Sequence, residues 1–343
     1  MPKQHIYVFD PTYQDNQSKV RGIGRYLQVL RECFETEFTF VSSLEAISTS
    51  KATSTFINPF FNFLRPPLLS KRICAKQIAV IHDLIPLKHA SHFPVGLMGK
   101  IHIWKNKLAL KQYDTIITDS HESKKDIMTI LNIPERLIRV VYPALPRIFM
   151  QKPQQTAPQF VQSKIGDSPF CLYVGDATWN KNLPHIAHAV NAAQVYAIFV
   201  GKVFSTNPSV HPWNTDFHIF RRLIQNNKKV IFPGFITDQD LISLYAKAAF
   251  NILLSRDEGF GYSYIEAASQ SCPSLMSTIA VFHEIAGSAA CFVNPESISE
   301  TISSMRKIID SKSLQKDLGQ KALDRSNLYT QDKMKTEFLQ AVL

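Results

Sequence analysis

The sequence has no apolar run that approaches the roughly 20 residues a membrane-spanning helix needs. It also lacks low-complexity and repetitive segments, and its apolar content is ordinary for a globular chain. The first five residues lead directly into the apolar stretch 6–9, which is typical of a strand and not of a signal peptide. We therefore expect a globular protein that stays in the cytoplasm.

Cysteine is scarce, and its spacing argues against metal and redox motifs. The five cysteines form no C-x-x-C pair, and three of them lie among apolar residues. We expect buried thiols in place of disulfides or a zinc site. The sequence also lacks a compact run of Lys and Arg interleaved with aromatic residues, so we expect no nucleic-acid partner. The cysteines are Cys33, Cys74, Cys171, Cys272 and Cys291.

Negative charge is scarce in the first half of the chain. Residues 1–150 carry 20 Lys and Arg against 12 Asp and Glu, whereas residues 151–343 carry 18 against 16. A basic first half attracts anionic phospholipid headgroups, phosphate-bearing acceptors or nucleic acid. Peripheral association of this half with the inner face of the membrane is one expectation.

The stretch 256–266, Arg-Asp-Glu-Gly-Phe-Gly-Tyr-Ser-Tyr-Ile-Glu, is the most informative part of the chain. An apolar run of strand length precedes it and helix formers follow, so the order is strand, glycine-rich turn, helix. Gly259 and Gly261 let backbone amides approach a ligand, and the helix start favours an anion such as phosphate. Glu258 and Glu266 are suited to accept hydrogen bonds from sugar hydroxyls. The pattern indicates a nucleotide-sugar; the alternative is a strand edge closed by a tight turn.

Glu258 and Glu266, with seven residues between them around Gly259-Phe260-Gly261, resemble the E-x7-E motif of the family-four (group 1) retaining glycosyltransferases, which have the GT-B fold. The resemblance runs in order through most of the chain. It implies an α/β protein with two doubly wound Rossmann-like domains facing across a cleft, and 343 residues are natural for two domains. We expect residues 1–150 to form the acceptor-side domain and residues 151–343 the nucleotide-sugar-binding domain, with the final helix crossing back onto the first.

Two stretches of the first half end strands with residues suited to a ligand. Gly22 and Gly24 follow the strand at 6–9 and precede helical spacing that begins at Tyr26. In the resembling family a glycine-rich loop here lines the acceptor side, and a plain helix start is the alternative. His82 and Asp83 leave the β-branched stretch 77–81, where a structural histidine is the alternative. By resemblance, His82 would reach the donor sugar.

A further strand, loop and helix open the second half. The stretch 170–174 ends at Gly175, and Lys181 follows six residues later at a helix start, where an amide and an ammonium would converge on a diphosphate. The resembling family usually has arginine directly after this glycine, but this chain has Asp176. Either Lys181 acts alone, or another base such as Arg256 or Lys202 compensates, or the donor is held less conventionally.

The resemblance implies the chemistry and the roles of these residues. Glu266 would bind the ribose, Glu258 and the backbone of 259–261 would hold the transferred sugar, and Lys181 would stabilise the leaving diphosphate, which makes a divalent ion unnecessary. The reaction would move a sugar, preferably mannose, from a GDP- or UDP-linked donor to a glycan, lipid-linked or protein acceptor with retention, in polysaccharide biosynthesis and without a cofactor. The predicted catalytic residues are His82, Glu258 and Lys181. The predicted substrate-binding residues are Gly22, Gly24, Asp83, Gly175, Gly259, Phe260, Gly261, Tyr262 and Glu266.

Two rival functions fit the same architecture. A non-catalytic sugar-nucleotide binder would keep the ribose and sugar contacts but could lose diphosphate charge, and Asp176 is the residue that favours it. A nucleotide-sugar epimerase of this fold would release free sugar without an acceptor. We rank a transferase ahead of both.

Residues 95–112 have helical spacing with lysines around Ile103, Trp104 and Leu108. Basic residues beside a tryptophan can mark a membrane-surface face. We prefer the alternative, a stripe of core residues under solvated lysines. The lysines are Lys100, Lys105, Lys107 and Lys111.

Asp238 and Asp240 form a D-x-D pair that could hold a cation in another class of transferases. We prefer a helix start, with Thr237 or Asp238 as the N-cap and Asp240 as a first-turn acid. The prediction for this pair is therefore a cap and no metal.

Overall fold

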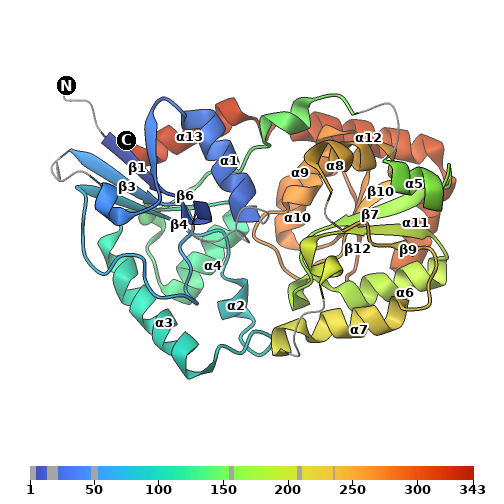
Figure 1. Ribbon diagram of the computed structural model, residues 1–343, viewed down its shortest axis with the longest axis horizontal. Coiled ribbons are helices and arrows are strands. Elements are labelled where there is room, and N and C mark those ends of the chain that lie inside the picture. Colours follow the sequence, from blue (N-terminus) through green and yellow to red (C-terminus); the bar gives the residue numbers. More distant parts are fainter. Residues whose placement is uncertain (1–4, 14–21, 48–52, 154–157, 207–210, 235) are drawn as a thin grey trace. The chain divides into compact units, whose positions relative to one another are not determined.

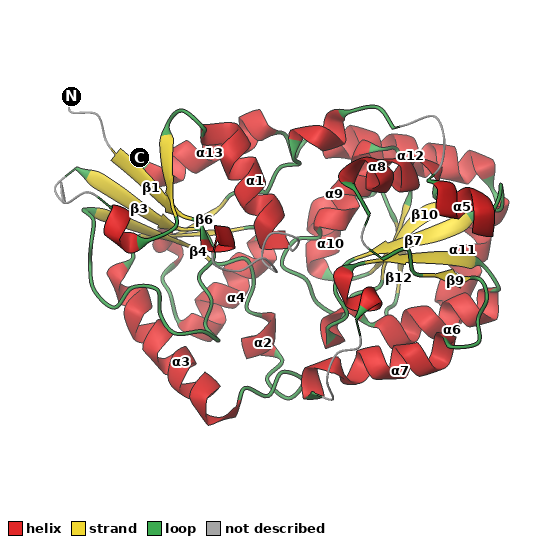
Figure 2. Ribbon diagram, viewed as in Figure 1, coloured by secondary structure: helices red, strands yellow, loops and turns green. Residues whose placement is uncertain are grey.

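The computed structural model describes residues 5–13, 22–47, 53–153, 158–206, 211–234 and 236–343. The chain divides into two compact units, one made of Met1–Pro146 with Tyr329–Leu343 and the other of Arg147–Leu328 (Figure 1). Each unit contains one six-stranded sheet covered by helices (Figure 2), and every strand pair in both sheets is parallel. This architecture is the predicted α/β class. Within the described residues, the helices are too short or too polar to cross a membrane.

The sheet of the first unit has the strand order β2-β1-β3-β4-β5-β6. Its central strands are buried on both faces, so that Ile6 and Val8 of β1 pack on one side and Tyr7 and Phe9 on the other. The strands are β1 (His5–Phe9), β2 (Phe38–Val41), β3 (Ser54–Asn58), β4 (Lys76–Val80), β5 (Thr115–Thr118) and β6 (Ile138–Val140). The helices are α1 (Gly22–Phe34), α2 (Ile85–Lys88), α3 (Gly96–Ala109), α4 (His121–Leu131) and α13 (Gln331–Val342).

The last helix of the chain, α13, belongs to the core of the first unit. The ring of Phe338 lies 5.4 Å from that of Phe34 in α1, and both are fully buried. Gln331 Nε2 donates to Glu32 Oε2 over 2.6 Å. These contacts bring the end of the chain, Tyr329–Leu343, into the unit that contains its start.

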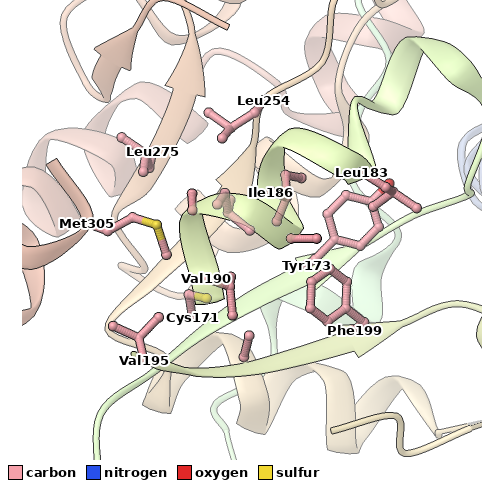
Figure 3. Packing of buried hydrophobic residues seen from close by; sticks show 14 of the residues in the cluster. Cys171, Tyr173, Leu183, Ile186, Val190, Val195, Phe199, Leu254, Leu275 and Met305 are labelled. Atoms are coloured by element: carbon pink, nitrogen blue, oxygen red, sulfur yellow. The ribbon is translucent and has the colours of Figure 1, made fainter. Parts of the chain in front are cut away.

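The sheet of the second unit has the order β12-β11-β10-β7-β8-β9. Helices α6, α7 and α11 cover one face, where Leu183, Ile186 and Val190 pack against Tyr173 and Phe199 (Figure 3). The strands are β7 (Phe170–Val174), β8 (Tyr196–Val200), β9 (Val230–Ile231), β10 (Phe250–Leu253), β11 (Ser274–Ser277) and β12 (Cys291–Val293). The helices are α5 (Gln159–Lys164), α6 (Leu183–Ala193), α7 (Thr215–Ile224), α8 (Asp238–Lys247), α9 (Tyr262–Ser269), α10 (Ala280–Ala286), α11 (Ile298–Asp310) and α12 (Lys312–Ser326).

Two predictions about local structure are confirmed. Thr237 is the N-cap of α8, and its side chain and that of Asp240 form a reciprocal capping box. The Asp240 carboxylate is thus committed to the helix start. The cysteines are free thiols, four of them buried and Cys291 half-buried.

Two other predictions are wrong. Helix α1 begins at Gly22, so Gly22 and Gly24 lie in its first turn and not in a loop before Tyr26. On α3, Trp104 and Leu108 are 61% and 44% exposed and do not form a core stripe. The inward face of α3 is taken by other residues of the helix.

Candidate active site

The two loops with the predicted donor site lie at one edge of the second sheet. Strands β7 and β10 pair in parallel, so the loops that follow them start side by side at their carboxyl ends. Two hydrogen bonds join the loops: Arg256 N donates to Asn180 O over 2.7 Å, and Asn180 Nδ2 donates to Asp257 O over 3.0 Å. Asn180 is buried, so these contacts fix the spacing of the loops.

Lys181 and Glu258 meet between these loops. The Lys181 ammonium lies 2.5 Å from Glu258 Oε1, and Ser255 Oγ donates to the same oxygen over 2.6 Å. The side chains are 23% and 10% exposed, so the pair is largely shielded from water. Each of the two shielded charges therefore has the other as its partner.

The turn before α9 depends on glycine. Gly261 has a φ of 112°, and a Cβ atom there would lie 3.2 Å from Cε1 of Phe282. Phe260 is buried beside it and meets Tyr262 edge to face, with ring centroids 5.8 Å apart. This turn presents the first amides of α9 at the carboxyl edge of the sheet, where an anion is favoured.

Glu266 lies inside α9 and is only 4% exposed. Its Oε2 accepts a hydrogen bond from the Tyr245 hydroxyl of α8 over 2.9 Å. A buried carboxylate with a donated hydrogen bond keeps one rotamer, so Tyr245 positions Glu266.

Two hydrogen bonds between nearby residues hold the loop after β7. Asp176 Oδ1 accepts from Ala177 N over 2.7 Å, and Asp176 O accepts from the Tyr173 hydroxyl over 2.5 Å. Gly175 approaches the neighbouring loop so closely that a Cβ on Gly201 would lie 2.2 Å from Gly175 O. Asp176, where the resembling family has arginine, thus stabilises the turn.

Of the two bases that we considered as helpers of Lys181, Arg256 has other partners. Its guanidinium donates to Asp216 Oδ2 over 2.8 Å and to Trp179 O over 2.6 Å, and it lies 5.0 Å from the centre of the Trp179 ring. Lys202 is exposed at the start of a short 3-10 helix. Arg256 therefore ties α7 to the loop after β7.

In the first unit, His82 follows β4 and is held on both ring nitrogens. Nδ1 lies 2.7 Å from Asp119 Oδ2, at the end of the neighbouring strand β5, and Nε2 lies 3.0 Å from Pro59 O. Both partners are acceptors, so the ring satisfies both only as an imidazolium. Burial lowers the pKa of His82, but the carboxylates of Asp119 and Asp83 and the Pro59 carbonyl outweigh it, and the pKa stands above its ordinary value.

The remaining predicted residues of the first unit lie on helix starts. Gly22 is exposed at the first position of α1, and a Cβ there would meet nothing within 4 Å. The Asp83 side chain is exposed, and its Oδ1 accepts from Ile85 N over 3.0 Å at the start of α2.

Residues 155–325 match the protein-family model described as glycosyl transferases group 1. They form a group 1 glycosyl transferase domain. The match confirms the family that the E-x7-E motif indicates, and it covers both loops of the site described above.

Curated relatives of the chain include two mannosyltransferases. The O-antigen chain mannosyltransferase RfbU of Salmonella typhimurium is 25% identical over 237 residues, which cover 68% of this chain and 60% of that protein. The serotype-specific mannosyltransferase WbdA of Escherichia coli is 24% identical over 264 residues, which cover 73% of this chain and 31% of that protein. The chain thus aligns with less than two thirds of either relative.

Solved structures confirm the predicted GT-B class. Anabaena HepE, solved in complex with UDP and glucose, has a TM-score of 0.74 at 15% identity, with 98% of each chain covered. WaaG, a glycosyltransferase involved in lipopolysaccharide biosynthesis, has a TM-score of 0.66 at 12% identity, covering 98% of this chain and 99% of that one. At these identities the likeness carries the fold alone.

Within the group 1 domain, the structure brings together Lys181, Glu258 and the turn before α9. Sequence reasoning missed Tyr245, which holds Glu266, and Asn180, which joins the two loops. It also missed Asp119 in the first unit. Only Asp119 had a usable signal, because it follows a strand that neighbours β4.

Proposed function

We propose that this chain is a retaining glycosyltransferase that moves a sugar from a nucleoside diphosphate donor to an acceptor hydroxyl in polysaccharide assembly. The pairing of Lys181 with Glu258 beside the turn before α9 carries the proposal. It places one cation, one carboxylate and a helix start together, and these suit a diphosphate joined to a sugar. The mannosyltransferase relatives support mannose as the first sugar to test.

In this proposal each half of the donor replaces one partner of the ion pair. The diphosphate takes the Lys181 ammonium, and the sugar hydroxyls donate to the Glu258 carboxylate that the lysine leaves. As the bond from the anomeric carbon to the diphosphate oxygen breaks, negative charge grows on the diphosphate, and Lys181 with the first amides of α9 stabilises it. The acceptor oxygen bonds to the anomeric carbon on the same face, and its proton passes to the leaving diphosphate oxygen. Glu266, held by Tyr245, binds the ribose.

Three further points belong to the proposal. The nucleotide is guanosine or uridine diphosphate, and HepE, whose structure contains UDP, supports this donor class. The acceptor is a glycan, a lipid-linked sugar or a protein hydroxyl. Lys181 supplies the positive charge at the diphosphate, so we expect turnover without a divalent ion or other cofactor, by an enzyme that works in the cytoplasm.

The test is donor binding by the whole chain, followed by turnover. We expect one nucleotide-sugar, among GDP-mannose, UDP-glucose and their relatives, to raise the melting temperature equally with and without EDTA. Glu258→Gln should then keep nucleotide affinity and lose most transfer. Manganese-dependent activity, or unchanged transfer by this variant, would contradict the proposal.

A non-catalytic sugar-nucleotide binder is the second candidate, and Asp176 favours it. The residue after Gly175 brings a carboxylate to a loop that the proposal assigns to a diphosphate, and it is exposed there. This candidate predicts a melting shift with a nucleotide-sugar but neither transfer nor hydrolysis. Replacement of Asp176 by Arg would then strengthen nucleotide diphosphate binding.

A further inference from the structure

Helix α3 of the first unit has two polar side chains, Asn106 and His102, turned inward. Asn106 is 2% exposed, and its Nδ2 donates to Arg65 O over 2.7 Å and to Phe63 O over 3.3 Å. His102 Nδ1 lies 3.1 Å from Leu64 O. These bonds satisfy three consecutive carbonyls of the preceding loop, so they fix the rotation of α3 about its axis.

This rotation leaves the large apolar side chains of α3 in solvent. Leu97, Trp104 and Leu108 are 75%, 61% and 44% exposed, and Met98 is 62% exposed. Positions 97, 104 and 108 fall on one face of a helix, with half-buried Ile101 among them. The described residues contain eight exposed large hydrophobic side chains, and four of them are on this one helix. Such a concentration is not the scattered exposure of an ordinary surface.

The same helix is purely basic in charge. Residues 84–113 contain five lysines and three histidines and neither aspartate nor glutamate. Helical geometry puts Lys100 and Lys107 on one side of the apolar face and Lys105 on the other, and Lys111 follows in the 3-10 helix Leu110–Gln112. All four are exposed. The face is therefore an apolar ridge between two cationic margins.

The charge decides among the possible occupants of this ridge. A second copy of the chain would bring lysines against lysines in a symmetric contact, which costs free energy. An anionic bilayer suits both parts: the tryptophan and leucines enter the interface and the lysines reach the headgroups.

We propose that α3 lies in the surface of an anionic lipid bilayer, with Leu97, Trp104 and Leu108 inserted and the lysines around them on the lipid headgroups. At 14 residues, α3 offers a contact about 21 Å long. The inference does not depend on sugar transfer, because it rests on the first unit alone.

The test is sedimentation of the full chain with vesicles, without donor or acceptor. We expect binding to vesicles of phosphatidylcholine and phosphatidylglycerol, weakening at high salt, and at least tenfold weaker binding to phosphatidylcholine alone. Lys100→Gln with Lys107→Gln should lower the partition coefficient about 25-fold, since each interfacial lysine contributes about fivefold. Exposed Lys312 and Lys316 of α12, changed to Gln in the same way, are the matched charge control and should leave it unchanged.

The apolar half of the proposal has its own variant and control. Leu97→Ser with Trp104→Ser should reduce vesicle binding at least tenfold. Met150→Ser is matched in exposure, 72% against 75% for Leu97, and should bind like the wild type. Equal melting temperatures of all variants would show that each is folded.

Three results would overturn the proposal. The first is no binding to anionic vesicles by the wild type. The second is equal loss of binding in the α3 variants and their controls. The third is a dimer in solution that Leu97→Ser and Trp104→Ser dissociate while vesicle binding persists, because α3 would then be an interface between copies.

Discussion

The ion pair between Lys181 and Glu258 allows a quantitative test of the candidate site. Lys181→Met removes the ammonium and leaves a carboxylate that is 10% exposed with Ser255 as its other donor. Breaking a fully buried pair costs about 3–5 kcal/mol, and a hydrogen bond to a charged group contributes about 1.5–3 kcal/mol. Lys181 is 23% exposed, so water screens part of the interaction, and we expect a loss of about 2 kcal/mol. In a unit of this size that lowers the melting temperature by about 4–8 °C.

The assay must report the second unit alone. The chain has three tryptophans, of which Trp104 lies in the first unit and Trp179 and Trp213 in the second. In a Trp104→Phe background, tryptophan fluorescence therefore follows the unfolding of the second unit in urea. Lys202→Met removes another lysine at the carboxyl edge of the sheet and should change stability by less than about 0.5 kcal/mol.

A double-mutant cycle then separates the pair from its surroundings. Glu258→Gln alone should cost about 1 kcal/mol, since the amide oxygen still accepts from Ser255. The double variant should be less destabilised than the sum of the two single variants by about 1–2 kcal/mol. Additive losses would refute the reasoning, because they would mean that the two charges do not stabilise each other.

Three other predictions address positioning, strain and pH. Tyr245→Phe should weaken donor binding about 3–10-fold in calorimetry with the fold intact, because its hydroxyl holds a site carboxylate; unchanged affinity would contradict this. Gly261→Ala should destabilise by about 1–3 kcal/mol because of its positive φ, whereas Gly22→Ala, with open space around it, should be neutral or stabilising by up to about 1 kcal/mol. Asp119→Asn should be most destabilising near pH 6, because the raised pKa of His82 gives stability that is complete below about 6.5 and is lost as the pH rises through the folded value. A difference from the wild type that stays constant between about pH 6 and 9 would exclude this coupling.

Local patterns predicted the parts of the site that lie close together in the sequence. The order of strand, turn and helix around Gly259 and Gly261, and the strand that ends at Gly175, depend on spacing within one segment. The family and the α/β class could be inferred from these segments together. Contacts between segments could not. Lys181 and Glu258 are 77 residues apart, and their meeting depends on the pairing of β7 with β10.

The orientation of helices was the other limit of sequence reasoning. On α3 the spacing of Ile103, Trp104 and Leu108 allowed a buried stripe. The carbonyls of the loop at 63–65 instead face α3, where Asn106 and His102 satisfy them. A buried carbonyl without a donor is costly, and Asn106 and His102 meet this requirement from the inward face of α3. The sequence of the helix alone does not contain this requirement.

In both units, a basic side chain that follows one strand is held by a carboxylate that follows an adjacent strand: His82 by Asp119 and Lys181 by Glu258. The carboxyl edge of a parallel sheet collects such residues, and a charge shielded from water needs a partner there. As an ion pair, Lys181 and Glu258 together carry no net charge. A diphosphate alone would bind the Lys181 ammonium and leave the Glu258 carboxylate without its cation. A diphosphate joined to a sugar would give the lysine an anion and the glutamate hydroxyl donors at the same time. The ion pair thus favours binding of the complete nucleotide-sugar over binding of the nucleotide diphosphate.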